Sequence, residues 1–285
     1  PAKMVVRFKS NMRLMWPYSQ EVTGNLFYTW DPGMNAFIIK GGNKEFGLIL
    51  GSNSRPNQHV IGPYNEVIKS DTLLRGVEGE NFLVSGGLEF NLEANDNLDM
   101  IITASNEGLV ELEKNYKAAM INPQAIHIEA IESTRGFLEE HTQVITPNSV
   151  FNEGYQWALI GANRFYVDTP GLGKSLVAGY STTATGWDGD HQVNGRPGYA
   201  WYFGRDAQWC AFALLNYGDF EKVKSILTIF QDYQDLSGKI FHELSTSGVV
   251  HYDAADATPL YIVLAGRYLK HSGDLKFIRK SWPHI

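Results

Sequence analysis

The chain has 285 residues, a hydrophobic fraction of 44% and a formal net charge of −7 at pH 7. This length and apolar content suffice for one large buried core or two smaller ones. The acidic balance, without a run of Lys or Arg, argues against a nucleic-acid partner. No segment reaches the ~20 apolar residues of a membrane span. The single cysteine, Cys210, excludes a disulfide within the chain and a cysteine-based metal site.

The N-terminal part contains short runs rich in β-branched and aromatic residues, separated by turn signals such as Asp31-Pro32-Gly33. The runs are Val5–Phe8, Leu26–Trp30, Ala36–Ile39, Phe46–Leu50, Asn81–Val84, Leu88–Leu92 and Met100–Ala104. They predict an antiparallel β-sandwich domain over residues 1–106. The charged and periodic stretch that follows predicts a helical linker over residues 107–147. The fold class we expect is therefore α+β, with more than one domain.

From Asn148 onward, two tight-turn signals predict a repeat of helical hairpins. Gly218-Asp219 and Gly273-Asp274 each follow an apolar run and open an amphipathic one. Gly commonly ends a helix in the left-handed conformation, and Asp is a preferred N-cap of the next helix. We therefore predict alternating inner and outer helices over residues 148–285, and no β-strand between residues 206 and 270.

The two kinds of helix differ in their apolar patterns. Ala207–Leu215 and Leu260–Leu269 are apolar nearly all round, as buried inner helices should be. The helix after Asp219 has a one-sided stripe instead, formed by Val223, Ile226, Leu227 and Phe230. The long connections 168–205 and 233–255 then lie at the end opposite the tight turns. Because they are rich in Gly, Tyr, Trp, His and Asp, we expect the functional site there.

Two other patterns are rejected as sites. Residues 171–175 (GLGKS) resemble the end of a phosphate-binding loop, but the first glycine of that motif would fall on Asp168. The eight histidines show no metal-ligand spacing, and His242 and His251 are interpreted as ordinary surface residues. We predict neither a metal nor a cofactor.

Two carboxylates are the stronger chemical signal. Asp206 and Asp256 are each predicted to open an inner helix on the face of the long connections. Asp often caps helix N-termini, so a capping role is the alternative for both. Aromatic rings beside carboxylates also suit a sugar, which stacks on ring faces and offers hydroxyls to acids. The aromatic residues near these aspartates, some of which could be structural, are Trp187, Tyr199, Trp201, Tyr202, Phe203 and Tyr252.

Residues 198–206 (GYAWYFGRD) resemble the G-Y-x-W-F…G-R-D signature of the C-terminal family of glycogen debranching enzymes, the amylo-α-1,6-glucosidases. Residues 171–180 are similar to the lead-in of that family, and residues 252–257 (YDAADA) resemble its Y-N-x-x-D-A motif. The resemblance covers residues 148–285 through motifs, and residues 1–125 in general character. Ala207 replaces the usual Thr, and this feature, like the run from Asp256 to Leu260, is closer to the glucoamylase family.

The resemblance implies an (α/α)6 barrel behind a β-sandwich, of which residues 148–285 would hold about the first five helices. It implies Asp256 as the general acid of an inverting reaction, with Arg205 and Asp206 as clamps for sugar hydroxyls. The catalytic base of the family would lie downstream of residue 285, so we expect the chain to be truncated. The further substrate contacts we expect are Trp187, Trp201, Tyr202 and Tyr252.

The expected activity is that of an amylo-α-1,6-glucosidase, with an α-glucan oligo- or polysaccharide as its substrate. The alternatives are a glucoamylase, another hydrolase of the same fold such as a trehalase-like or α-mannosidase-like enzyme, and a non-catalytic carbohydrate-binding protein. We expect a cytoplasmic location, while a periplasmic or secreted one stays open.

Overall fold

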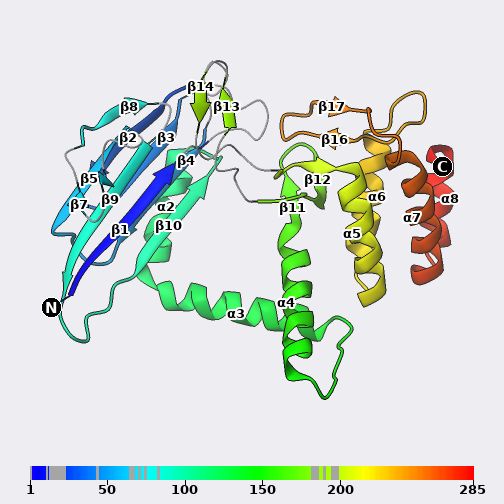
Figure 1. Cartoon of the computed structure of the whole chain (residues 1–285), viewed down its shortest axis with the longest axis horizontal. Helices are drawn as coiled ribbons and strands as arrows, with labels where there is room; N and C mark the ends of the chain where they lie inside the picture. The colour runs from blue at the N-terminus through cyan, green and yellow to red at the C-terminus, as the bar shows by residue number, and fades with distance from the viewer. Residues whose placement is uncertain are drawn as a thin grey trace. The chain divides into compact units, whose positions relative to one another are not determined.

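The computed structural model describes residues 2–10, 12, 24–42, 45–63, 68–69, 72–73, 76–81, 84–180, 186–188, 191–193 and 199–285. They form a mixed α+β chain with antiparallel sheets, as predicted (Figure 1). The chain divides into two compact units, one of Pro1–Ala130 with Trp187–Gln192, the other of Ile131–Gly186 with Val193–Ile285. None of the helices within the described ranges has the length and apolar character that crossing a bilayer requires.

Two antiparallel sheets make up most of the first unit. One has the order β1-β9-β5, with bounds Ala2–Ser10, Val84–Leu92 and Gln58–Pro63. The other has the order β10-β4-β3-β2-β8, with bounds Met100–Ser105, Gly47–Ser52, Ala36–Gly41, Leu26–Asp31 and Gly79–Asn81. A short ladder joins β6 (Ile68–Lys69) to β7 (Thr72–Leu73).

Both sheets contribute side chains to one apolar core. Phe37 of the five-stranded sheet and Leu88 of the three-stranded sheet are fully buried in the same cluster. Strand β2 alternates with a period of two, since Leu26 and Tyr28 are buried whereas Phe27 between them is 48% exposed.

The strand predictions for the first unit fail at the run Asn81–Val84 and at β5, β6 and β7, which were not predicted. The run at Asn81–Val84 is not one strand, because β8 ends at Asn81 and β9 begins at Val84. Strand β5 was missed, since its sequence QHVIGP has few β-branched residues and carries both Gly and Pro. It is a strand because β9 pairs with it along its whole length.

The predicted linker contains two helices of different character. Helix α2 (Leu109–Ile121) packs on β4 and β10 through Leu112 and Tyr116, which are fully buried. The Tyr116 hydroxyl donates to the Met34 carbonyl at 3.3 Å. Helix α3 (Pro123–Glu139) has no buried side chain, and the boundary between the two units falls within it. Helix α2 is therefore part of the core of the first unit rather than a simple connector.

The second unit contains the predicted helices and both tight turns. Gly218 and Gly273 end helices in the left-handed conformation, with φ of 97° and 69°. Asp274 caps the following helix by accepting from the Phe277 amide at 2.9 Å. Asp219 makes no such bond, and its carboxylate pairs with Lys222 instead. The helices are α4 (Ser149–Phe165), α5 (Gly204–Tyr217), α6 (Phe220–Asp232), α7 (Ala257–Ser272) and α8 (Leu275–Ser281), followed by the 3-10 turn η1 (Trp282–His284).

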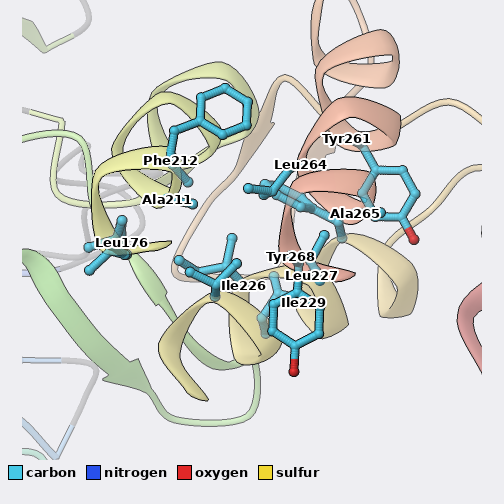
Figure 2. Close-up of a cluster of buried hydrophobic side chains, with 14 of the residues drawn as sticks. Leu176, Ala211, Phe212, Ile226, Leu227, Ile229, Tyr261, Leu264, Ala265 and Tyr268 are labelled. Carbon is cyan, nitrogen blue, oxygen red and sulfur yellow. The ribbon is translucent and has the colours of Figure 1, made fainter. Parts of the chain in front are cut away.

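The core of this unit lies where α5, α6 and α7 meet, and Figure 2 shows side chains of these helices pointing toward one another. All four residues of the predicted α6 stripe, Val223, Ile226, Leu227 and Phe230, are fully buried. The inner helices are not buried all round, however. Trp209 of α5 is 60% exposed and Val263 of α7 is 48% exposed. The prediction that α5 and α7 are buried all round is therefore wrong for one face of each helix. An apolar sequence does not ensure that another element covers that face within the described residues.

The connections contain short strands, including two in the region where the sequence predicted none. Residues 171–175 belong to the turn and second strand of the hairpin β11–β12 rather than to a phosphate-binding loop. Strands β16 and β17 have two residues each, which is too short for an alternating pattern to be recognised in the sequence, so they were not predicted. The bounds are β11 (Tyr166–Thr169), β12 (Gly173–Leu176), β13 (Gly186–Asp188), β14 (His191–Val193), β15 (Tyr202–Phe203), β16 (Glu243–Leu244) and β17 (Val250–His251).

Candidate functional site

The N-termini of α5 and α7 are brought together by a glycine. A Cβ atom on Gly204 would lie 2.0 Å from the Phe241 carbonyl oxygen and 3.2 Å from Cβ of Ala257. Gln208, one turn into α5, is fully buried and donates from Nε2 to the Ala257 carbonyl at 2.9 Å. The two helix starts are therefore neighbours in space, although a long connection separates them in the sequence.

The two predicted aspartates stand at these helix starts, but neither acts as a cap. The N-cap position of α5 is Phe203, which places Asp206 inside the first turn. Asp256 occupies the N-cap position of α7, yet its side chain makes no capping hydrogen bond. The capping alternative therefore does not explain either carboxylate.

Arg205 links the two helix starts through Asp256. Its Nη1 lies 3.4 Å from Oδ2 of Asp256, and the two side chains are 55% and 43% exposed. An ion pair this exposed contributes about 0–1 kcal/mol, because water screens it. Both charged groups thus remain accessible to a ligand, and each can form charge-assisted hydrogen bonds with hydroxyl groups.

Arg205 and Asp206 also line a pocket of about 390 Å³ between α4, β12 and α5. Its walls are mainly apolar and include Phe165 and Trp209. The pKa of the Cys210 thiol in the same pocket is raised, mainly by burial and to a smaller extent by the nearby carboxylate of Asp206. The lining does not include Asp256, Trp201 or Tyr202, so Arg205 is the residue shared by the pocket and the ion pair.

An aromatic segment leads into α5. Tyr199 is 57% exposed, whereas Trp201 and Phe203 are buried and stacked with ring centroids 5.3 Å apart. The indole Nε1 of Trp201 donates to Oε2 of Glu243 at 2.9 Å. Tyr199 is thus the exposed ring of this segment, and its centroid lies 5.9 Å from that of Trp201 and 5.8 Å from that of Phe203.

The hydroxyls of Tyr202 and Tyr252, two of the predicted substrate contacts, are bonded to backbone carbonyls of the protein, and their contact with a substrate stays a prediction. Tyr202 is 1% exposed, and its hydroxyl lies 2.7 Å from the Gly173 carbonyl and 3.0 Å from the Val167 carbonyl. It is a core residue, because side chains alternate along the extended segment and Tyr202 faces inward. Tyr252 is partly buried, and its hydroxyl donates to the Tyr233 carbonyl at 2.7 Å. Burial raises the pKa of both hydroxyls.

Trp187 belongs to strand β13, and its side chain lies outside the described residues. Its role as a substrate contact stays a prediction.

Three residues of this region were not among the predicted site residues. His242 Nδ1 lies 2.7 Å from Oδ1 of Asp253 and 3.9 Å from Oε1 of Glu243. The hydrogen bond from His242 is the main reason why the pKa of Asp253 is lowered. The sequence signal that could have found them is the dipeptide His242-Glu243 between the buried residues Phe241 and Leu244. Two polar residues enclosed by buried ones need specific partners.

Among the residues that the structure describes, no group of three or more His, Cys, Asp or Glu side chains is arranged to hold a metal ion.

No protein-family model matches the sequence, and no curated protein matches it at the sequence level. The structure is similar to that of a bacterial glucoamylase complexed with acarbose, with a TM-score of 0.56 and 12% sequence identity. The similarity covers 94% of this chain and 39% of the glucoamylase chain. The chain shares its fold with part of a glucoamylase.

Two further structures are more distant. A family GH92 inverting mannosidase from Bacteroides thetaiotaomicron VPI-5482 gives a TM-score of 0.47 at 13% identity, covering 87% of this chain and 35% of that one. A family GH92 α-mannosidase from Bacteroides thetaiotaomicron gives 0.39 at 10% identity, covering 90% and 42%.

Proposed function

We propose that the protein is a glycoside hydrolase that acts on α-linked glucans by an inverting acid–base mechanism. The observation that carries this proposal is the placement of Arg205, Asp206 and Asp256 at two adjacent helix N-termini, where Arg205 and Asp256 form an exposed ion pair. The fold supports it, since the similar glucoamylase structure contains acarbose.

Each group has a role in the proposed reaction. Asp256 is the general acid that protonates the glycosidic oxygen as the leaving group departs. Arg205 and Asp206 hold sugar hydroxyls, which require both donors and acceptors at the ring edge. A water molecule attacks the anomeric carbon from the opposite face, activated by a carboxylate about 6.5–9.5 Å from the acid in enzymes of this kind. We assign the helices of the second unit to part of an (α/α)6 toroid.

Two bond specificities follow from different observations. The GYAWYFGRD and YDAADA segments favour an α-1,6-glucosidase of the debranching type. The similarity to a glucoamylase structure supports a glucoamylase-like enzyme equally well. A comparison of isomaltose with maltose separates the two, because the first disaccharide contains only an α-1,6 bond and the second only an α-1,4 bond.

The variant Asp256→Asn in the full-length protein tests the proposal. Asn keeps the shape of the side chain but cannot deliver a proton, so kcat on maltose or panose should fall by about 10²- to 10⁴-fold. α-Glucosyl fluoride has a leaving group that needs no protonation, and the variant should retain far more activity on it. Asp232→Asn, an exposed aspartate at the end of α6, is the matched control and should leave both activities unchanged.

Equal losses on the glucoside and the fluoride would show that Asp256 is not the acid. Asp206→Asn should instead weaken substrate binding, because it removes a charged acceptor for hydroxyls. Binding of maltooligosaccharides by the wild-type protein without any turnover would favour the non-catalytic alternative.

A further inference from the structure

The dipeptide His242-Glu243 contacts both segments that carry the proposed site. Glu243 accepts the indole N–H of Trp201. Trp201 lies three residues before Gly204, the first residue of α5, which also carries Arg205 and Asp206. His242 binds the side chain of Asp253, which lies between β17 and Asp256. Two adjacent residues thus contact the segment before α5 through Glu243 and the segment before α7 through His242.

Backbone hydrogen bonds fix the dipeptide itself. The His242 carbonyl accepts from the amide of Gly204, the first residue of α5, at 2.8 Å. The His242 amide donates to the His251 carbonyl of β17 at 2.7 Å. Glu243 pairs with Phe203 on one side and with His251 on the other. His242 directly precedes β16, and its backbone is bonded on both sides, to Gly204 and to His251, which gives the imidazole a rigid support.

The segment from Tyr252 to Asp256 is irregular, and its side chains hold it in place. The Tyr252 hydroxyl is bonded to the Tyr233 carbonyl, Asp253 to His242, and Asp256 to Arg205. The side chain of Asp253 is 72% exposed, and that of His242 is 28% exposed. Ala254 packs against the core, but packing does little to orient the exposed carboxylate of Asp253, so the 2.7 Å bond to His242 is the contact that holds this side chain.

We propose that His242 is a positioning residue for the carboxyl group of Asp256. Its Nδ1–H bond to Asp253 fixes the turn that ends at Asp256, and so fixes the direction in which the proposed acid presents its proton. The charged groups around this imidazole are Asp253, Glu243 and, across the turn, His251. This inference rests on the proposed function, because it assigns His242 a role through Asp256.

The test compares two substitutions of His242 on two substrates in the full-length protein. His242→Ala removes the donor, and a displaced acid should lower kcat on maltose or panose by about tenfold to a hundredfold. KM should change little, because Arg205 and Asp206 are untouched. Activity on α-glucosyl fluoride should fall far less, since that reaction needs no proton from Asp256. A merely structural role would lower both activities together.

His242→Asn supplies the rescue, because its amide N–H takes a position close to that of Nδ1–H and should recover most of the glucosidase activity. Asp253→Ala should reproduce the defect of His242→Ala, and the double variant should be no worse than either single one. His271→Asn, at an exposed position in the last turn of α7, is the matched control. Unchanged melting temperatures confirm that the variants fold.

Three results would overturn the inference: full activity of His242→Ala, equal losses on the glucoside and the fluoride, or failure of His242→Asn to improve on His242→Ala. If the wild-type protein hydrolyses none of these substrates, the proposed function itself fails, and this is evident before any variant is made. The inference is supported if the wild-type protein hydrolyses these substrates and His242→Ala is impaired only on those whose leaving group needs a proton.

Discussion

Gly204 is the residue whose replacement most directly tests how the site is built. Its substitution by Ala places a Cβ 2.0 Å from the Phe241 carbonyl oxygen, at least 1 Å short of the 3.0 Å that real Cβ contacts respect. The obstacle is backbone, so no rotamer change relieves it. The Gly204 amide is bonded to the His242 carbonyl at 2.8 Å, so a shift of α5 also strains that bond.

The expected cost follows from this geometry. Overpacking a filled site typically destabilises a protein by about 1–3 kcal/mol, and we expect Gly204→Ala near the upper end. A loss of about 3 kcal/mol lowers the ratio of folded to unfolded protein by roughly a hundredfold. Because Arg205 reaches Asp256 only if α5 and α7 start side by side, glucosidase activity should fall as well.

Gly266→Ala is the matched control, since Gly266 lies in the interior of α7 with no atom within 4 Å of the added Cβ. Ala is favoured over Gly in a helix by about 0.8–1 kcal/mol, so this variant should be slightly more stable than wild type. Urea unfolding followed by circular dichroism gives the free energies, and amide hydrogen exchange of α5 and α7 shows where the loss falls. Wild-type stability of Gly204→Ala, or equal damage from Gly266→Ala, would refute the close approach.

Two further predictions concern the cores. Leu227→Ala, at a fully buried position of α6, should cost about 2–5 kcal/mol in urea unfolding, whereas Leu236→Ala, at a fully exposed position, should stay within about 0.5 kcal/mol of wild type; similar losses in both would contradict the packing of α6. In the first unit, burial raises the pKa of Tyr116 from 10.0 to about 12, so the native state favours the protonated hydroxyl. Its contribution to stability is fully present below pH 10 and is lost as the pH rises from 10 to about 12. Stability measured across that range should decline less in Tyr116→Phe than in wild type, and an equal decline would exclude Tyr116 as a cause.

The parts of the fold that the sequence predicted depend on local chemistry. Gly218 and Gly273 adopt a left-handed conformation that other residues rarely adopt. A glycine directly after an apolar run therefore predicts the end of a helix without reference to the rest of the fold. The stripe from Val223 to Phe230 has helical spacing and needs one partner surface, whichever element supplies it. Both predictions are confirmed because the cause lies within a few residues of the effect.

The failures share a different cause, which is pairing between distant segments. Strand β5 is defined by β9, and β16 by β15 and β17, rather than by their own composition. Tyr202 has the same residue type as the exposed Tyr199, and only the pairing of Tyr202 with Leu244 determines which ring faces the core. The bond between His242 and Asp253 likewise depends on the path of a loop.

Gly204 shows how the order of residues around Arg205 carries structural information that the aromatic residue types do not. Glycine at this position allows α5 to approach Phe241 and Ala257, and the approach brings the residue after it within 3.4 Å of Asp256. The order Gly-Arg-Asp therefore encodes a backbone requirement and a charged contact together. An aromatic residue encodes only apolar area, which either the core or a ligand can use. The contact of Arg205 with Asp256 is thus tied to a position where an added Cβ would meet backbone, whereas the residue type of Tyr202 does not decide whether its ring packs in the core.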